Sequence, residues 1–218
     1  MSRRQNAFAE RDQAASAFSA ALMRLCEGTG VAGAALVDSE GETVDYAGWL
    51  DPFDIKVAAA EWQLVVGTLR ESKVPTWPES HQLVVRASRR SYSIVPLSEG
   101  YAIVATLTRH CFEISERALA EAVRELCSES GLSLPPYFAL SRERWTRVQV
   151  QTSPDDKRRA HALWHGGSWR KLEILGRYTP ADLGPNEVGY RARLPTGAEL
   201  MLVREPLGTW YADDIPSG

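Results

Sequence analysis

His165-Gly166-Gly167 is the stretch of the sequence that comes nearest to a catalytic motif, because it matches the oxyanion loop of lipases. Such a loop donates backbone N–H groups to the charge that develops on an attacked carbonyl. It works with a nucleophilic serine in a GxSxG turn, and the chain contains no GxSxG turn. Two glycines between two predicted strands are also typical of a β-hairpin. We therefore predict a hairpin turn at this point and no oxyanion hole.

The remaining residues with catalytic or metal-binding chemistry form no known motif. The four histidines lack HExxH or HxH spacing, and the three cysteines contain no CxxC pair. Neither GxxxxGK[ST] nor GxGxxG occurs, so we expect no nucleotide-binding loop and no cofactor. No nucleophile, base and orienting group come together. We predict no catalytic residue, no metal site and no enzyme; only a deep pocket with convergent polar groups would indicate an uncharacterised enzyme.

Charged residues cluster at a few places in the chain. Asp155-Asp156 and Asp213-Asp214 stand in predicted loop or terminal segments, where we expect them to be solvated. Lys157-Arg158-Arg159 is the only basic cluster. It is either a solvated loop or a contact for phosphate or an acidic partner.

The composition is that of a folded globular protein. Of the 218 residues, 44% are apolar and 24% charged, and the net charge is −3 with a pI near 5.9. A chain this acidic lacks the overall positive field that attracts nucleic acid, so we do not expect a nucleic-acid partner. The N-terminus has no signal-peptide pattern, and no apolar run approaches the ~20 residues that span a bilayer. Three unevenly spaced cysteines fit a reducing compartment. We expect a cytoplasmic protein with no membrane contact.

Charge and tryptophan are distributed unevenly along the chain. Residues 1–140 carry 13 Lys and Arg against 18 Asp and Glu, whereas residues 141–218 carry 12 against 10. Four of the seven tryptophans also fall in the last third. We predict two unlike domains, at residues 14–132 and 142–218, with an N-terminal extension at 1–13. Leu134-Pro135-Pro136-Tyr137 marks a linker at 133–141, because proline cannot continue a helix.

The first predicted domain has the element order α-β-β-α-β-β-β-α. Amphipathic spacing predicts its helices, and runs of β-branched and small residues between turn signals predict its strands. The third helix has an N-cap at Ser115 and ends at Gly131. The other elements are expected at Ala14–Glu27, Val31–Val37, Glu42–Ala47, Asp54–Ser72, Gln82–Arg86, Ser91–Leu97 and Tyr101–Thr108.

The predicted helix at Asp54–Ser72 has two apolar faces. At 100° per residue, one stripe is formed by Ile55, Ala59, Trp62, Val66 and Leu69. The nearly opposite side carries Val57 and Leu64 with the small residues Ala60 and Gly67, and Lys56, Gln63 and Arg70 form a polar strip between the stripes. An ordinary surface helix needs only one apolar face. The helix is therefore either buried between two layers of one domain, or packed on a sheet with one face and on a partner helix with the other.

The order of elements and several stretches resemble the roadblock/dynein light-chain domain family. The similarity covers residues 14–130 and is carried by Gly30–Gly41, by the Ala-rich second helix and by Ser93–Tyr101 with the strand that follows. The loop Arg109–Phe112 differs, because it is bulky and basic where loops of the family are short and polar.

This resemblance implies an α+β fold of the roadblock/profilin type. It has a five-stranded antiparallel sheet with the second helix on one face and the terminal helices on the other. Members of the family homodimerise through the second helix and a sheet edge, and they act as scaffolds or regulators of Ras-like GTPases or as motor-complex light chains.

The C-terminal third reads as a small all-β domain, barrel-like or SH3-like. It is also faintly similar to a small all-β domain of unknown function associated with bacterial repair polymerases. Its predicted strands alternate in polarity or flank turn residues. They are expected at Trp145–Thr152, Ala160–His165, Ser168–Tyr178, Val188–Leu194, Glu199–Arg204 and Leu207–Tyr211.

A two-residue Gly-Gly turn fixes the register of the hairpin around it. His165 then faces Ser168, and Trp164 faces Trp169, while Leu163, Leu172 and Ile174 point to the other face. One face of the hairpin forms the core of the domain. The two tryptophans on the other face must cover either the first domain or an external ligand.

These observations predict a non-catalytic regulatory or scaffold protein. It would homodimerise and bind a Ras-like small GTPase or another roadblock protein. The expected protein-binding residues are Val57, Ala60, Leu64 and Gly67, with Trp164 and Trp169 as a second surface. The alternative is a binding module in which aromatic residues beside arginines in the C-terminal domain recognise a peptide or single-stranded nucleic acid. Those pairs are Trp145/Arg147, Trp169/Arg170 and Tyr190/Arg191.

Overall fold

The computed structural model describes most of the chain in two compact units. The described residues are 12–71, 80–109, 111, 114–140, 145–178, 183 and 186–213. The chain divides into residues 1–141 and 142–218, which are described separately below. The predicted extension at 1–13 lies almost entirely outside the described residues, as do His110 and Phe112 of the divergent loop. Within the described ranges, no helix is both long and apolar enough to cross a membrane.

The N-terminal unit has the predicted element order, with one five-stranded antiparallel sheet in the strand order β2-β1-β5-β4-β3. A 3₁₀ turn at Ser98–Gly100 joins the last two strands of this unit. The elements are α1 (Ala17–Cys26), β1 (Val31–Val37), β2 (Thr43–Gly48), α2 (Pro52–Glu71), β3 (Leu83–Val85), β4 (Ser91–Pro96), β5 (Ala102–Leu107), α3 (Glu116–Ser130) and α4 (Pro136–Leu140).

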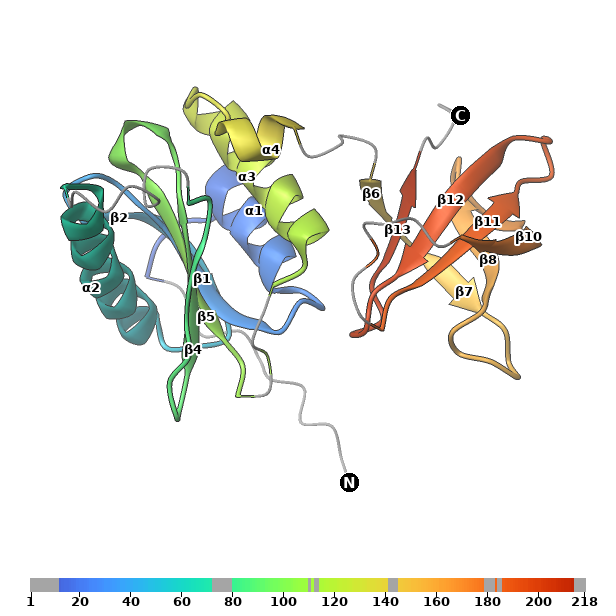
Figure 1. Cartoon of the computed structure of the whole chain (residues 1–218), viewed down its shortest axis with the longest axis horizontal. Helices are drawn as coiled ribbons and strands as arrows, with labels where there is room; N and C mark the ends of the chain where they lie inside the picture. The colour runs from blue at the N-terminus through green and yellow to red at the C-terminus, as the bar shows by residue number, and fades with distance from the viewer. Residues whose placement is uncertain are drawn as a thin grey trace. The chain divides into compact units, whose positions relative to one another are not determined.

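Helices cover both faces of this sheet, as expected (Figure 1). Helix α2 packs on β1, β2 and β5 from one side, whereas α1 packs on β1, β2 and α3 on the other side. The cap signals behave as predicted for α3, because the Ser115 side chain accepts a hydrogen bond from Ala118 N and Gly131 ends the helix at φ 74°. Helix α1 begins with a capping box formed by Ser16 and Ser19.

The segment predicted as a linker contains a short helix. Pro136 starts α4, because proline suits the first position of a helix, where its missing N–H has no intrahelical partner. Phe138 of this helix is buried and meets the ring of His81 edge-on, at 6.5 Å between ring centroids. Tyr137 stacks on the same imidazole at 3.5 Å. Residues 136–140 are therefore packed on the N-terminal unit.

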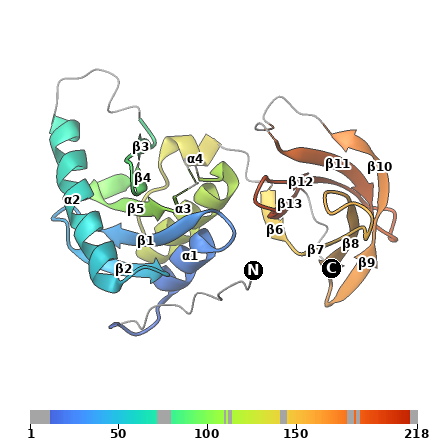
Figure 2. The same ribbon diagram turned by 90° about the horizontal axis from the view of Figure 1, so that it is seen from below.

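The C-terminal unit consists of two antiparallel sheets that share one core (Figure 2). Their strand orders are β10-β11-β12-β13-β6 and β7-β8-β9. The strands are β6 (Trp145–Val148), β7 (Val150–Thr152), β8 (Ala160–His165), β9 (Ser168–Lys171), β10 (Glu173–Tyr178), β11 (Val188–Arg193), β12 (Glu199–Arg204) and β13 (Trp210–Asp213). This arrangement agrees with an all-β unit; the SH3-like assignment remains a prediction.

Two predicted strands are each divided between the two sheets. Trp145–Thr152 forms β6 in the five-stranded sheet and β7 in the three-stranded one. Ser168–Tyr178 breaks at Leu172, where β9 ends in the three-stranded sheet and β10 begins in the five-stranded one. Leu172 is buried in the shared core together with Leu163. Between β9 and β10 the chain therefore passes from one sheet to the other at a single buried apolar residue.

Burial of Cys26 predicts how the free energy of unfolding depends on pH. Burial raises the pKa of this thiol from 9.0 to about 12, and the side chain is 1% exposed. The unfolded thiol ionises first, so this contribution to stability is complete below pH 9 and is lost between pH 9 and about 12. We expect the wild type to lose roughly 1.4 kcal/mol per pH unit above 9 from this group.

The measurement is urea unfolding at two pH values, one below and one above 9, for the wild type and Cys26→Ala. The alanine variant is less stable overall, but its stability should fall less steeply with pH. Equal slopes for the two proteins would show that the thiol ionises in the folded state.

Candidate protein-interaction surfaces

The buried face of α2 fixes the helix to the sheet. Ile55, Ala59 and Val66 are at most 3% exposed. Gly33 of β1 makes this approach possible, because a Cβ at that position would lie 2.9 Å from Ile55 Cδ1. The predicted stripe that faces the sheet is therefore confirmed.

The polar side chains of α2 bond back to their own unit. Gln63 is 4% exposed, and its Nε2 donates to the Gly100 carbonyl at 2.7 Å. The Arg70 Nη2 donates to the carbonyls of Leu97 at 3.1 Å and Tyr101 at 3.3 Å, and burial lowers the pKa of this guanidinium. The expected polar strip thus anchors the helix to the β4–β5 turn.

Two ion pairs hold the first half of α2. The Lys56 ammonium lies 2.6 Å from the Asp12 carboxylate, and this hydrogen bond is the main cause of a lowered Asp12 pKa. The Asp54 carboxylate lies 3.0 Å from Nη1 of Arg90, in the turn before β4. These contacts leave only apolar and small side chains along the middle of the outer face.

The outer face of α2 is an exposed apolar stripe, which we call the α2 stripe: Phe53, Val57, Ala60, Leu64 and Gly67. Leu64 is 70% exposed and Val57 38%. Ala60 and Gly67 are partly exposed. The positions follow the three- and four-residue spacing of one helix face. Within the described part of the N-terminal unit the helix is therefore not buried between two layers, because one of its apolar faces has no cover there.

Phe53 belongs to this stripe and was missed from the sequence. It is 72% exposed and stands four residues before Val57. The predicted helix began at Asp54, so Phe53 fell outside the pattern. Asp51-Pro52 marks the N-terminal boundary of this helix in the sequence, since proline favours the first helical position, but the apolar pattern was counted only from Asp54.

The second predicted surface is the tryptophan pair of the C-terminal unit. Trp164 pairs with Trp169 across β8 and β9, and His165 with Ser168, as the two-residue turn predicts. The indole centroids are 5.4 Å apart at 71°, an edge-to-face arrangement. The side chains are 44% and 41% exposed, whereas Leu163 on the opposite face is buried. Whether the pair binds a partner stays a prediction.

Only one of the three expected aromatic–arginine pairs remains available at the surface. Tyr190 is buried and stacks on Trp210 in the core, and Arg191 pairs with Glu199 at 2.5 Å. Trp145 and Arg147 are half-buried on β6. Trp169 and Arg170 are both exposed, but they stand on opposite faces of β9, since Trp169 pairs with Trp164 and Arg170 with the buried Leu163.

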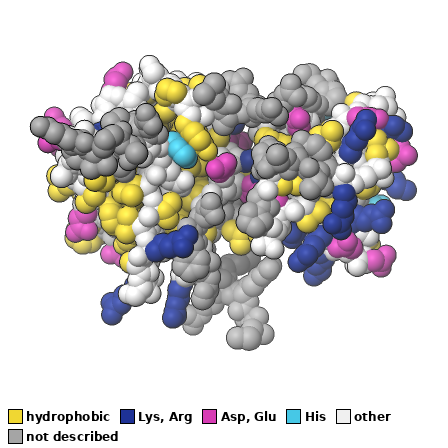
Figure 3. Space-filling view, viewed as in Figure 1, with side chains coloured by type: hydrophobic (Ala, Val, Ile, Leu, Met, Phe, Trp, Pro, Cys, Tyr) yellow, Lys and Arg dark blue, Asp and Glu magenta, His cyan; other side chains and the backbone are white. Residues whose placement is uncertain are grey.

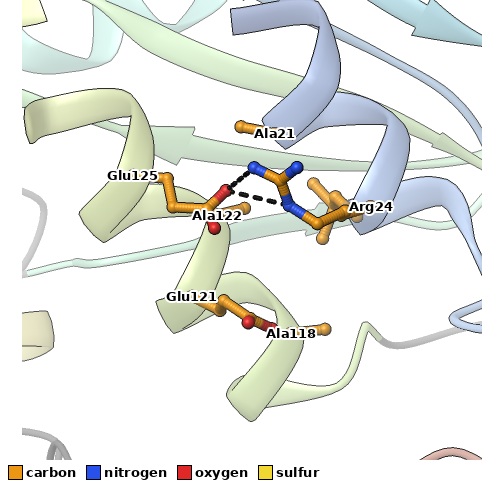
Figure 4. Close-up of a pocket in the computed structure, with 7 residues that line it drawn as sticks. Ala21, Arg24, Ala118, Glu121, Ala122 and Glu125 are labelled. Carbon is orange, nitrogen blue, oxygen red and sulfur yellow. Dashed lines mark hydrogen bonds and ion pairs between the residues drawn. The ribbon is translucent and has the colours of Figure 1, made fainter. Parts of the chain in front are cut away.

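A small depression lies between α1 and α3, and its lining residues do not form a catalytic arrangement (Figure 4). The Arg24 guanidinium from α1 pairs with Glu125 from α3, and three alanines and a leucine form most of the remaining lining. Among the described residues, no three His, Cys, Asp or Glu side chains are placed to hold a metal ion.

Solved structures of roadblock proteins are similar to about half of this chain. Myxococcus xanthus MglB is 17% identical, with 55% of this chain and 98% of that chain covered at a TM-score of 0.44. A roadblock/LC7 domain from Streptomyces avermitilis is 17% identical, with 52% and 94% covered and a TM-score of 0.42. The gliding protein MglB from Thermus thermophilus is 16% identical, with 55% and 97% covered and a TM-score of 0.38.

No protein-family model matches the chain, and no curated protein matches it in sequence. The element order, the antiparallel five-stranded sheet and the placement of α2 opposite α1 and α3 are those that the sequence resemblance implied. The N-terminal half of the chain is therefore roadblock-like in architecture.

Gly67 yields a stability test of the α2 stripe. A Cβ added there would meet no atom within 4 Å, so no described residue of the N-terminal unit requires glycine at this position. Glycine inside a helix costs up to about 1 kcal/mol relative to alanine. We expect Gly67→Ala to raise the free energy of unfolding by about 0.5–1 kcal/mol in a monomeric background, measured by urea unfolding.

Gly131→Ala is the matched control. A Cβ at Gly131 also meets no atom within 4 Å, but its φ of 74° is unfavourable for alanine, so this variant should lose stability. A loss of stability in Gly67→Ala as well would mean that the outer face of α2 is covered within the chain.

Proposed function

We propose that the chain is a non-catalytic regulatory or scaffold protein whose roadblock-like unit homodimerises through the α2 stripe. The main observation behind this proposal is the exposure of Phe53 and Leu64, because most of each large apolar side chain lies in water. Burying such a side chain contributes about 1.5–3 kcal/mol. In a symmetric pair, both copies bury the same residues, so the gain is doubled.

Small residues in the middle of the α2 stripe favour a second helix as the element that packs against it. Ala60 and Gly67 stand on either side of Leu64 in the three- and four-residue spacing. Side-chain size sets how closely two helix axes approach, within about 8–10 Å. Leu64 of one copy can then fill the space that Ala60 and Gly67 leave open on the other.

The dimer in turn would bind a Ras-like small GTPase or another roadblock protein. This part of the proposal rests on the sequence resemblance at residues 14–130 and on the matching arrangement of helices around the sheet. Because the described residues bring together no catalytic set, any effect on nucleotide hydrolysis would come from reshaping the loops of the GTPase itself.

Replacing Leu64 tests the interface. A charged side chain in the centre of an apolar contact must be buried without a partner, which is costly. We expect light scattering at micromolar protein to give the mass of a dimer for the wild type and of a monomer for Leu64→Arg. Glu129→Arg, an exposed substitution of similar size at the end of α3, is the matched control and should remain dimeric. A dimeric Leu64→Arg would exclude the α2 stripe as the interface.

Partner capture tests the functional half of the proposal. Tagged wild-type protein is incubated with native lysate containing excess GDP or a non-hydrolysable GTP analogue, and bound proteins are identified by mass spectrometry. We expect a small GTPase or a second roadblock protein to be retained, with a GTPase retained differently in the two nucleotides. Capture of neither class under either condition would contradict the assignment.

A further inference from the structure

The C-terminal unit carries an aromatic and basic surface that the proposed function does not use. We propose that the exposed face of β7, β8 and β9 binds single-stranded nucleic acid, with bases stacking on Trp164 and Trp169 and phosphates meeting the cations around them. This inference does not depend on the dimer or on a GTPase partner.

The tryptophan pair supplies the stacking surface. The two indoles pack edge to face on the side of the sheet that points away from the core residue Leu163, and more than two fifths of each side chain is exposed. Stacking of a base on an aromatic ring contributes about 1–3 kcal/mol and tolerates any base, because every base has a π-face. The exposed pair therefore offers flat apolar area that the unit itself leaves in water.

Polar side chains continue this face along the sheet. Lys171 lies two residues beyond Trp169, so it projects from the same side of β9. It pairs with Ala162 on β8, which pairs with Gln151 on β7. An amide and an ammonium group thus stand in the row next to the two indoles.

The cations of this region are not neutralised within the unit. Lys157, Arg158, Arg159 and Lys171 are exposed, and none makes an ion pair with a described residue. Arg170 is exposed as well, but it pairs with Leu163 and so projects from the opposite face of β9. By contrast, Arg191 and Arg193 in the neighbouring sheet both pair with Glu199. Residues 149–171 hold five Lys and Arg against two Asp. Figure 3 shows Lys and Arg side chains gathered on the visible face of this unit.

The basic turn before β8 is held in place by hydrogen bonds. The Tyr190 hydroxyl donates to the Arg158 carbonyl at 2.9 Å, and burial raises the pKa of this phenol. Ser153 N donates to the Arg159 carbonyl at 2.9 Å, and Arg158 N to the Asp156 carboxylate at 2.8 Å. The turn lies about 16 Å along β8 from Trp164, at 3.3 Å per residue. An extended strand of a few nucleotides is long enough to reach both ends.

The chemistry of the surface favours a nucleic-acid strand over an acidic peptide or a duplex. Both acidic peptides and nucleic acids carry negative charge. Each nucleotide has a flat base beside its charged phosphate, whereas an acidic side chain has only a carboxylate. A duplex hides the faces of its bases in the stack, where the indoles cannot reach them. The whole chain is acidic at −3, which is why its composition alone predicts no nucleic-acid partner, whereas the charge of residues 149–171 is locally positive.

Fluorescence anisotropy with labelled single-stranded oligothymidine and the full-length protein tests this inference. We expect binding at low salt that weakens steeply as salt rises, because phosphate contacts release counterions. Trp164→Ala and Trp169→Ala should each weaken binding about five-fold or more. Leu207→Ala is the control, because it removes an exposed apolar side chain from the β12–β13 turn and should leave affinity unchanged.

Charge variants distinguish direct contacts with phosphate groups from non-specific electrostatic attraction of the oligonucleotide. Lys171→Gln should lower the slope of log affinity against log salt by about one, for the one phosphate contact that is lost. Arg191→Gln removes a cation that already pairs with Glu199 and should leave the slope unchanged. Circular dichroism checks that each variant folds, and Trp164→Phe retains a ring if the alanine variant does not fold.

Three results would overturn the inference. They are the absence of binding to oligothymidine at low salt, equal affinity in the wild type and the folded tryptophan variants, and displacement of the oligonucleotide by polyglutamate at equal charge. The last would assign the surface to an acidic peptide. The Leu64→Arg variant should bind oligothymidine with the same affinity per protomer as the wild type. A failure of this inference and a failure of the proposed dimer are therefore distinguishable.

Discussion

The packing of α2 against β1 and β5 is the constraint on which the rest of the N-terminal unit depends. The Ile55 side chain sits directly on Gly33, and a Cβ at that position would require Ile55 to shift. Gln63 and Arg70 then reach backbone carbonyls of the β4–β5 turn. With Gln63 and Arg70 bonded inward, one outer face of the helix presents the α2 stripe of Phe53, Val57, Ala60, Leu64 and Gly67. The exposed stripe is thus a consequence of how the helix is anchored.

The two units present different kinds of surface. On α2, aliphatic and small residues follow helical spacing, which suits a second helix and direct apolar contact. On β7–β9, two indoles stand among cations that have no described partner, which suits an anionic ligand with flat groups. A protein with both surfaces can associate with itself and hold a separate ligand at the same time.

The periodicity of the sequence was sufficient to predict most of the fold. The two-faced helix and the register of Trp164 against Trp169 followed from spacing alone, because a helix repeats every 3.6 residues and a two-residue turn permits one register. Periodicity predicts on which face of a helix or strand a side chain lies, but it does not predict which residues pack against that face. The exposure of Leu64 and the burial of Gln63 therefore had to come from the structure.

Tertiary contacts explain the elements that were predicted wrongly. Residues 136–140 form a helix inside the expected linker because Phe138 finds an apolar site beside His81. The strand after Ser168 divides at Leu172 because that side chain enters a core shared by two sheets. Phe53 was missed for a local reason, since the start of α2 was placed two residues late.

The claim that the α2 stripe is covered by a second copy is tested most directly by the unfolding midpoint at different protein concentrations. If folding and dimerisation are coupled, mass action raises the thermal midpoint as concentration rises. We expect this rise in the wild type across about two decades of concentration, and no rise in Leu64→Arg. A wild-type midpoint independent of concentration would contradict the account.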